Sequence, residues 1–143
     1  MNISIIKQDL FKVEQGYYLA HCISADFALG AGVAKTFVEV YNMREKLKTL
    51  HCDYKFDGEG TAILVDNVFN LITKDKYWHK PTYDSITDAL ISMKDQIEEL
   101  HITKLAMPKI GCGLDRLDWD EIYKIIEDIF YDTDIDILIC TID

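Results

Sequence analysis

The sequence predicts a three-layer α/β/α domain built around a mixed sheet of about six strands. Short apolar runs alternate along the chain with longer segments whose apolar residues recur at helical spacing, a pattern typical of α/β domains. Two neighbouring apolar runs are separated only by Asp66-Asn67, which predicts a hairpin. The chain has 143 residues, is 49% hydrophobic and contains no linker or repeat, so residues 1–143 are expected to form one domain.

The first strand is expected at residues 3–6, which form a short apolar run. A second strand, at residues 17–23, is mostly apolar, as expected for a strand that is buried on both faces of a sheet. The sequence Gly30-Ala31-Gly32 then interrupts the chain. From residue 33 to residue 41 the apolar side chains fall on one face of a helix, and a second short helix is expected at residues 43–50.

The second half of the chain begins with the hairpin, whose strands are expected at residues 61–65 and 68–72. Residues 83–100 carry apolar side chains three or four positions apart along their whole length and therefore predict an amphipathic helix. The remaining elements follow the same two patterns: a strand at 105–107, a helix at 119–130 and a closing strand at 135–141.

The charge balance is acidic, with 15 Lys and Arg against 25 Asp and Glu and a net charge of −10. Such a chain has no overall attraction to phosphate backbones, so a nucleic acid partner would need a local site. The four cysteines form no CxxC pair and are typical of free thiols in a reducing compartment. The sequence shows no signal peptide and no apolar run of about 20 residues. It therefore predicts a cytoplasmic protein without a membrane partner, and a monomer is the default expectation.

Ligands of α/β sheets bind at the carboxyl ends of strands, so the loops after Ile23, Ile72 and Met107 are the candidate sites. In the first loop, Gly30-Ala31-Gly32 leads into a helix. Its glycines allow the backbone to approach a ligand closely, and the free N–H groups at a helix start suit a diphosphate. The loop lacks a GxGxxG fingerprint and the lysine of a P-loop, so a purely structural turn is also compatible with it.

The loop after Met107 contains a second Gly-x-Gly sequence, Gly111-Cys112-Gly113, ahead of a helix. Its backbone amides are suited to the opposite side of the same diphosphate. Asp118 stands at the N-cap position of the next helix, and this structural role is favoured over a catalytic one. Asp115 lies inside the loop, where spacing alone leaves open both a ligand contact and local turn bonding.

The loop after Ile72 is basic and aromatic, and its composition does not distinguish among the lysines at positions 74, 76 and 80. A solvated surface loop is the simpler interpretation. Trp78, close to a helix start, is more typical of a core or staple position than of a pocket wall. Asp9 follows the first strand, where a carboxylate either bonds its own backbone, the commoner case, or accepts a hydrogen bond from an adenine amino group.

Taken together, these segments resemble the macrodomain family, and most closely its terminal ADP-ribose protein glycohydrolase subclass. The resemblance runs from Gln8 to the last strand, and its most specific part is residues 110–117. The other matching runs are residues 21–24 with 30–34, residues 71–74 and residues 79–83. Residues 27–29 and 75–78 are less typical of the family, which affects the expected substrate preference and not the fold.

The resemblance implies the α/β/α fold of a macrodomain and a cleft for ADP-ribose. It places the adenine against Asp9, the diphosphate between residues 30–33 and residues 111–114, and the distal ribose beside Ser24. The complete set of ligand-binding residues that it implies is Asp9, Leu10, His21, Ser24, Gly30, Ala31, Gly32, Val33, Ala34, Thr73, Pro108, Ile110, Gly111, Cys112, Gly113 and Leu114.

In that subclass a Lys and an Asp carry the hydrolysis, and by position these correspond to Lys74 and Asp115. The resemblance implies that Lys74 attacks the anomeric carbon of the distal ribose while Asp115 acts as acid and base. A role in which Lys74 only polarises the leaving group is the alternative. His21-Cys22-Ile23-Ser24 stands where better-known macrodomain hydrolases have an Asn-rich loop, which favours the Lys/Asp chemistry. No cofactor is expected, and the four scattered histidines predict no metal site.

The expected function is hydrolysis of mono-ADP-ribose from modified glutamate and aspartate side chains, with O-acetyl-ADP-ribose as a small substrate. The expected partners are therefore ADP-ribose and mono-ADP-ribosylated proteins. Alternatives are a reader that binds ADP-ribose without catalysis, removal of ADP-ribose from nucleic acid bases, and an unrelated nucleotide-binding domain. The presence of both Lys74 and Asp115 in matching context favours an enzyme over a reader.

Overall fold

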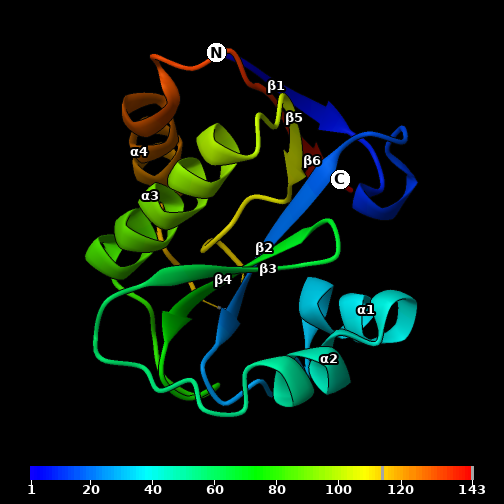
Figure 1. Ribbon diagram of the computed structural model, residues 1–143. Coiled ribbons are helices and arrows are strands. Elements are labelled where there is room, and N and C mark those ends of the chain that lie inside the picture. The colour runs from blue at the N-terminus through cyan, green and yellow to red at the C-terminus, as the bar shows by residue number, and fades with distance from the viewer. Residues whose placement is uncertain (114, 143) are drawn as a thin grey trace.

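The computed structural model describes residues 1–113 and 115–142 (Figure 1). Within these residues, no helix is long and apolar enough to cross a membrane. The elements in chain order are β1 (Asn2–Lys7), the short 3-10 helix η1 (Leu10–Lys12), β2 (Tyr18–Ser24), α1 (Gly32–Tyr41), α2 (Met43–Leu50), β3 (Thr61–Val65), β4 (Val68–Lys74), α3 (Tyr83–Glu99), β5 (Lys104–Met107), α4 (Trp119–Phe130) and β6 (Asp136–Thr141).

Each strand and α-helix expected from the sequence is present, with ends that differ by at most two residues from the expected ones. The 3-10 helix η1 was not expected. Its N-cap is Asp9, whose side chain accepts a hydrogen bond from the backbone N–H of Phe11 at 2.9 Å. This is the local bonding that is common for an Asp after a strand.

The six strands form one sheet in the order β1-β6-β5-β2-β4-β3. Neighbouring strands run parallel except in the β3–β4 hairpin, which confirms the predicted mixed sheet. The hairpin turns at Asp66, which adopts a left-handed φ of 55°. Because β5, β2 and β4 are adjacent and parallel, their carboxyl ends lie side by side at one edge of the sheet.

Helices cover both faces of the sheet, and Figure 1 shows α3 with α4 on one side and α1 with α2 on the other. Successive side chains of a strand point to opposite faces of the sheet, so each strand packs against both helix layers. In β4, Phe69 and Leu71 pack against α3 and α4, whereas Val68 and Ile72 pack in the cluster that contains Phe37 of α1. The observed architecture is therefore the three-layer α/β/α arrangement.

The helix starts differ in how their backbone N–H groups are satisfied. Asp118 caps α4 by accepting a hydrogen bond from the N–H of Asp120 at 3.0 Å, which confirms the predicted N-cap. Thr82 and Ser85 form a reciprocal capping box at the start of α3. Helix α1 follows Ala31, which has no side chain that can accept such a bond. Its first amides are therefore left for another partner.

Candidate active site

A cavity of about 600 Å³ opens at the carboxyl ends of β2, β4 and β5. Its walls come from the end of β2, the entry to α1, the end of β4 and the loop between β5 and α4. The lining residues are His21, Cys22, Ile23, Ser24, Ala28, Leu29, Gly30, Ala31, Gly32, Val33, Ala34, Lys74, Tyr77, Pro108, Ile110, Gly111, Gly113 and Asp115. The three candidate loops of the sequence thus meet around one cavity.

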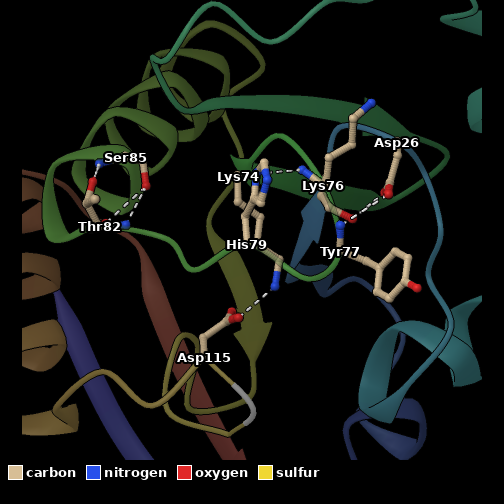
Figure 2. A network of polar contacts seen from close by, with 9 residues as sticks. Asp26, Lys74, Lys76, Tyr77, His79, Thr82, Ser85 and Asp115 are labelled. Atoms are coloured by element: carbon tan, nitrogen blue, oxygen red, sulfur yellow. Dashed lines mark hydrogen bonds and ion pairs between the residues drawn. The ribbon is translucent and has the colours of Figure 1, made fainter.

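Lys74 and Asp115 form an ion pair in the wall of this cavity (Figure 2). The Lys74 Nζ atom lies 2.7 Å from Asp115 Oδ1, and the two side chains are only 14% and 15% exposed. Lys74 is the last residue of β4, and Asp115 lies in the loop that precedes α4. Of the lysines at positions 74, 76 and 80, Lys74 is the one that lines the cavity, and Asp115 lines it as well.

The entry to α1 lines the cavity, and its first backbone amides have no side-chain cap. Gly32 has a left-handed φ of 60°, and the uncapped start of α1 lies in the cavity wall. The loop before it places Phe27 and Leu29 at φ values of 54° and 43°, which are strained for residues with large side chains. Arg44 of α2 supports this loop, because its guanidinium donates to the carbonyls of Ala28 at 2.8 Å and Leu29 at 3.1 Å.

The loop between β5 and α4 forms the facing wall and depends on Gly111. Gly111 has a φ of 74°, and a Cβ atom there would lie 2.9 Å from Cδ1 of Ile86 in α3. Its carbonyl accepts a hydrogen bond from the N–H of Leu117 at 2.7 Å, which closes the loop. Glycine is therefore favoured here by the left-handed φ, and a Cβ atom would in addition require the end of the Ile86 side chain to shift.

His21 is a buried, neutral histidine in the wall of the cavity. Its Nε2 atom lies 2.6 Å from Oδ1 of Asn70, whose Nδ2 donates to the carbonyl of Ile63. Since the Asn70 oxygen can only accept, His21 Nε2 carries the proton and Nδ1 is a bare acceptor. Burial lowers the pKa of His21 from 6.5 to about 4, against the opposing effect of the Asn70 hydrogen bond. His21 Nδ1 is one of two buried side-chain polar atoms without a partner in the described residues; the other is Oγ1 of Thr73.

This burial predicts a specific loss of stability in mild acid. The pKa of His21 is lower in the folded state, so the unfolded chain takes up a proton that the folded chain does not, and stability falls as the pH drops from 6.5 towards 4. Between pH 7 and pH 5 the free energy of unfolding should decrease by about 2 kcal/mol through His21. His21→Gln retains a donor for Asn70 but cannot titrate. Urea titrations at both pH values should show a smaller decrease for this variant, and equal decreases would contradict the prediction.

Cys22 lines the cavity beside the ion pair, but its chemistry does not favour a nucleophile. Burial, followed by the negative charge of Asp115, raises the pKa of the Cys22 thiol to about 12, although Lys74 opposes this. The thiol therefore remains protonated at neutral pH, and the thiolate that nucleophilic attack needs is absent. Lys74 and Asp115, 2.7 Å apart, are the charged pair beside this thiol.

Most of the residues expected to bind the ligand line the cavity: His21, Ser24, Gly30, Ala31, Gly32, Val33, Ala34, Pro108, Ile110, Gly111 and Gly113. Among the described residues of the expected set, four do not line it: Asp9, Leu10, Thr73 and Cys112. Leu10 and Thr73 are buried, and Cys112 packs against the core next to α3. Leu114 lies outside the described residues.

Several lining residues were absent from the expected set, chiefly Ile23, Ala28, Leu29 and Tyr77. Ile23 reads as an ordinary strand residue, and only the proximity of α1 brings it to the cavity. Tyr77 and Trp78 are each 63% exposed, so Trp78 is not the core or staple residue that its position favoured. Their rings lie 5.0 Å apart in an edge-to-face arrangement. An aromatic run after a strand was the available signal, but it does not distinguish a cavity mouth from a plain surface.

Known proteins match this chain in sequence over almost its whole length. The Macro domain family model matches residues 21–126. The chain is 39% identical over 142 residues to the ADP-ribose glycohydrolase OARD1 of Bos taurus and to that of Homo sapiens, covering 98% of this chain and 91% of each relative. Homology of this extent to a glycohydrolase identifies the chain as a hydrolase.

Solved structures with the same fold include two macrodomains. The macrodomain of Thermus aquaticus DarG aligns with a TM-score of 0.81 at 18% identity over 97% of both chains. That of Mycobacterium tuberculosis DarG aligns with a TM-score of 0.79 at 22% identity over 96% of both chains. Thermosipho africanus DarTG in complex with ADP-ribose aligns with a TM-score of 0.73 at 19% identity, over 97% of this chain and 41% of the other. The family model, the extended sequence identity and the shared fold together establish that this chain belongs to the macrodomain family.

Proposed function

We propose that this protein hydrolyses the bond between ADP-ribose and a modified glutamate or aspartate side chain, and that it also cleaves O-acetyl-ADP-ribose. The observation that carries the proposal is the Lys74–Asp115 pair, held at 2.7 Å in the wall of a cavity at the carboxyl edge of the sheet. The relatives named ADP-ribose glycohydrolase and the structural neighbour in complex with ADP-ribose support the choice of ligand.

The diphosphate is held between two sets of backbone amides. The uncapped start of α1, which begins at Gly32 and follows Gly30, lines one side of the cavity, and the loop with Gly111 and Gly113 lines another. Amides at a helix start and in a glycine-rich loop bind anions through their N–H dipoles. Such a local site accounts for anion binding by a chain whose net charge is −10. The distal ribose then lies beside Ser24, Lys74 and Asp115.

The reaction proceeds in two displacements at the anomeric carbon of the distal ribose. Lys74 Nζ gives a proton to Asp115 and attacks this carbon; a C–N bond forms, the C–O bond to the substrate carboxyl breaks, and the carboxylate leaves with the bonding electrons. Asp115 returns that proton to the departing carboxylate and so becomes a base again. It then accepts a proton from water, whose oxygen attacks the same carbon; the C–N bond breaks with its electrons on Lys74 Nζ, and Asp115 gives its proton back to Nζ. The products are ADP-ribose and the free side chain. The close, largely enclosed contact between Lys74 and Asp115 makes the proton transfer direct.

The test is to incubate the protein with a target that carries glutamate-linked ADP-ribose and to measure free ADP-ribose by chromatography. Release is the expected result. ADP-ribose binding in calorimetry without release would support a reader module instead.

A second substrate, in which ADP-ribose is attached to a nucleic acid base, is tested in parallel. It is chosen because the exposed rings of Tyr77 and Trp78 near the cavity suit a planar group. Release from this substrate alone would replace the proposed linkage by a base linkage.

A further inference from the structure

Asp26, in the loop after β2, joins two walls of the cavity through its carboxylate. One oxygen, Oδ1, accepts hydrogen bonds from the Ser24 hydroxyl at 2.5 Å and from the N–H of Ala28 at 3.2 Å. The other oxygen, Oδ2, accepts from the N–H of Tyr77 at 3.1 Å, which belongs to the loop after β4 (Figure 2). Asp26 therefore links the end of β2 and the loop after it, which hold Ser24 and Ala28, to the loop after β4, which holds Tyr77.

The bond from Ser24 determines what Ser24 can offer to a ligand. A hydroxyl has one hydrogen, and the Ser24 hydrogen is given to Asp26. Ser24 lines the cavity, and its oxygen therefore has only lone pairs to offer to a ligand. It is suited to accept a hydrogen bond from a ligand hydroxyl and unsuited to donate to a phosphate. A ribose hydroxyl is the matching partner.

The backbone of Asp26 fixes the position of the segment that follows Lys74. The N–H of Asp26 donates to the carbonyl of Asp75 at 3.1 Å, and the N–H of Ala25 donates to the carbonyl of Lys74 at 2.9 Å. Together with the bond from Tyr77, these contacts hold the end of β4 against the loop after β2. The register of the β2–β4 pairing shifts between Ile23 and Ser24. Beyond this shift, the two backbone hydrogen bonds take the place of regular strand pairing.

The Asp26 carboxylate stays ionised in this setting. Burial by itself would raise the pKa of Asp26, but the hydrogen bonds from Ser24, Tyr77 and Ala28 and the charge of Lys76 hold the pKa below its usual value of 3.8. At physiological pH both oxygens therefore act only as acceptors.

We propose that Asp26 is a positioning residue for the hydrolysis: it orients Ser24 as the acceptor for a hydroxyl of the distal ribose and holds the Lys74–Tyr77 segment, so that the anomeric carbon lies against Lys74 Nζ. This inference rests on the proposed function for the identity of the ligand. Asp26 itself acts through Ser24 and through the backbone of Tyr77.

Asp26→Asn is the test variant, and Asp75→Asn is its matched control. The amide of Asn turns one acceptor into a donor, which must then face the N–H of Tyr77 or the groups of Ser24 and Ala28. Asp75→Asn removes the same charge from the neighbouring loop and keeps the backbone carbonyl that binds Asp26. For Asp26→Asn, kcat should fall by about 10- to 100-fold while the Kd of ADP-ribose changes by less than about threefold. Asp75→Asn should change both by less than about twofold.

Two further measurements separate positioning from a general structural effect. In a Ser24→Ala background the loss of kcat caused by Asp26→Asn should shrink, because the two residues act as a unit. Amide exchange of Tyr77, followed by NMR, should be faster in Asp26→Asn than in Asp75→Asn. The proposal would be overturned by equal kcat values in the two Asn variants or by additive losses in the double variant. It would also be overturned if the Kd rose as much as kcat fell. If the wild type releases no ADP-ribose, the proposed function fails. The amide exchange of Tyr77 then tests the contact between Asp26 and Tyr77 by itself. Faster exchange in Asp26→Asn than in Asp75→Asn supports this contact, and equal exchange overturns it.

Discussion

Replacing Lys74 with Ala is expected to reduce the release of ADP-ribose by about a thousandfold or more, while the Kd of ADP-ribose changes by no more than about tenfold. In the proposed mechanism the Lys74 Nζ atom forms the bond to the substrate, and Asp115 acts on the proton of that same atom. In the proposed site the diphosphate is bound by backbone amides that Lys74 does not supply, so its removal is expected to leave most of the binding energy intact. Single-turnover release and calorimetry on the same preparations measure the two effects.

Lys74→Arg distinguishes a nucleophile from an electrostatic group. Arginine preserves a positive charge beside Asp115, but its guanidinium stays protonated and does not attack carbon. A nucleophilic role predicts that Lys74→Arg is as inactive as Lys74→Ala. A variant with Arg that keeps a tenth or so of the activity would show that the charge is what matters. Loss of ADP-ribose binding in parallel with activity would contradict the nucleophile assignment.

Replacing Gly60 with Ala is expected to destabilise the fold more than any other small substitution considered in this chain. Gly60 is buried next to β3, and a Cβ atom there would lie 1.8 Å from the backbone oxygen of Ser85 and 3.1 Å from the backbone nitrogen of Ala89. These atoms belong to α3, which cannot retreat without disturbing Leu90 and Met93 in the core. The free energy of unfolding should fall by about 3 kcal/mol or more.

Gly113→Ala provides the control for Gly60→Ala. A Cβ atom at Gly113 meets nothing within 4 Å, so the stability of this variant should stay within about 0.5 kcal/mol of the wild type. Thermal unfolding followed by circular dichroism should place the midpoint of Gly60→Ala about 10 °C below that of Gly113→Ala. Coincident midpoints would mean that α3 and β3 are less closely packed than the structure shows.

Much of the fold could be predicted because its elements are encoded by neighbouring residues. The helical spacing of apolar side chains in α3 and α4 and the Asp66-Asn67 turn of the hairpin are local signals, and the structure confirms each of them. The N-cap role of Asp118 is equally local. The 3-10 helix η1 escaped prediction because three residues are too few to show a period.

The candidate site could be predicted as a set of loops and, through the resemblance, as individual residues. The residues alone could not choose among the lysines at 74, 76 and 80, nor decide whether Asp115 bonds its own turn. The contact between Asp26 and Tyr77 carried no sequence signal, because it spans 51 positions and joins two separate loops.

The sequence by itself determined the strands and α-helices, the mixed sheet, the two glycine-rich loops and the membership of the macrodomain family. Each of these depends on residue types at short spacing or on recognisable runs. Tertiary structure alone decided which side chains meet: the pairing of β2 with β4 and the closure of the loop before α4 bring Lys74 within 2.7 Å of Asp115, 41 positions away. The physical reason is that such a contact depends on strand register and helix packing summed over the whole domain, which no single segment of the chain encodes.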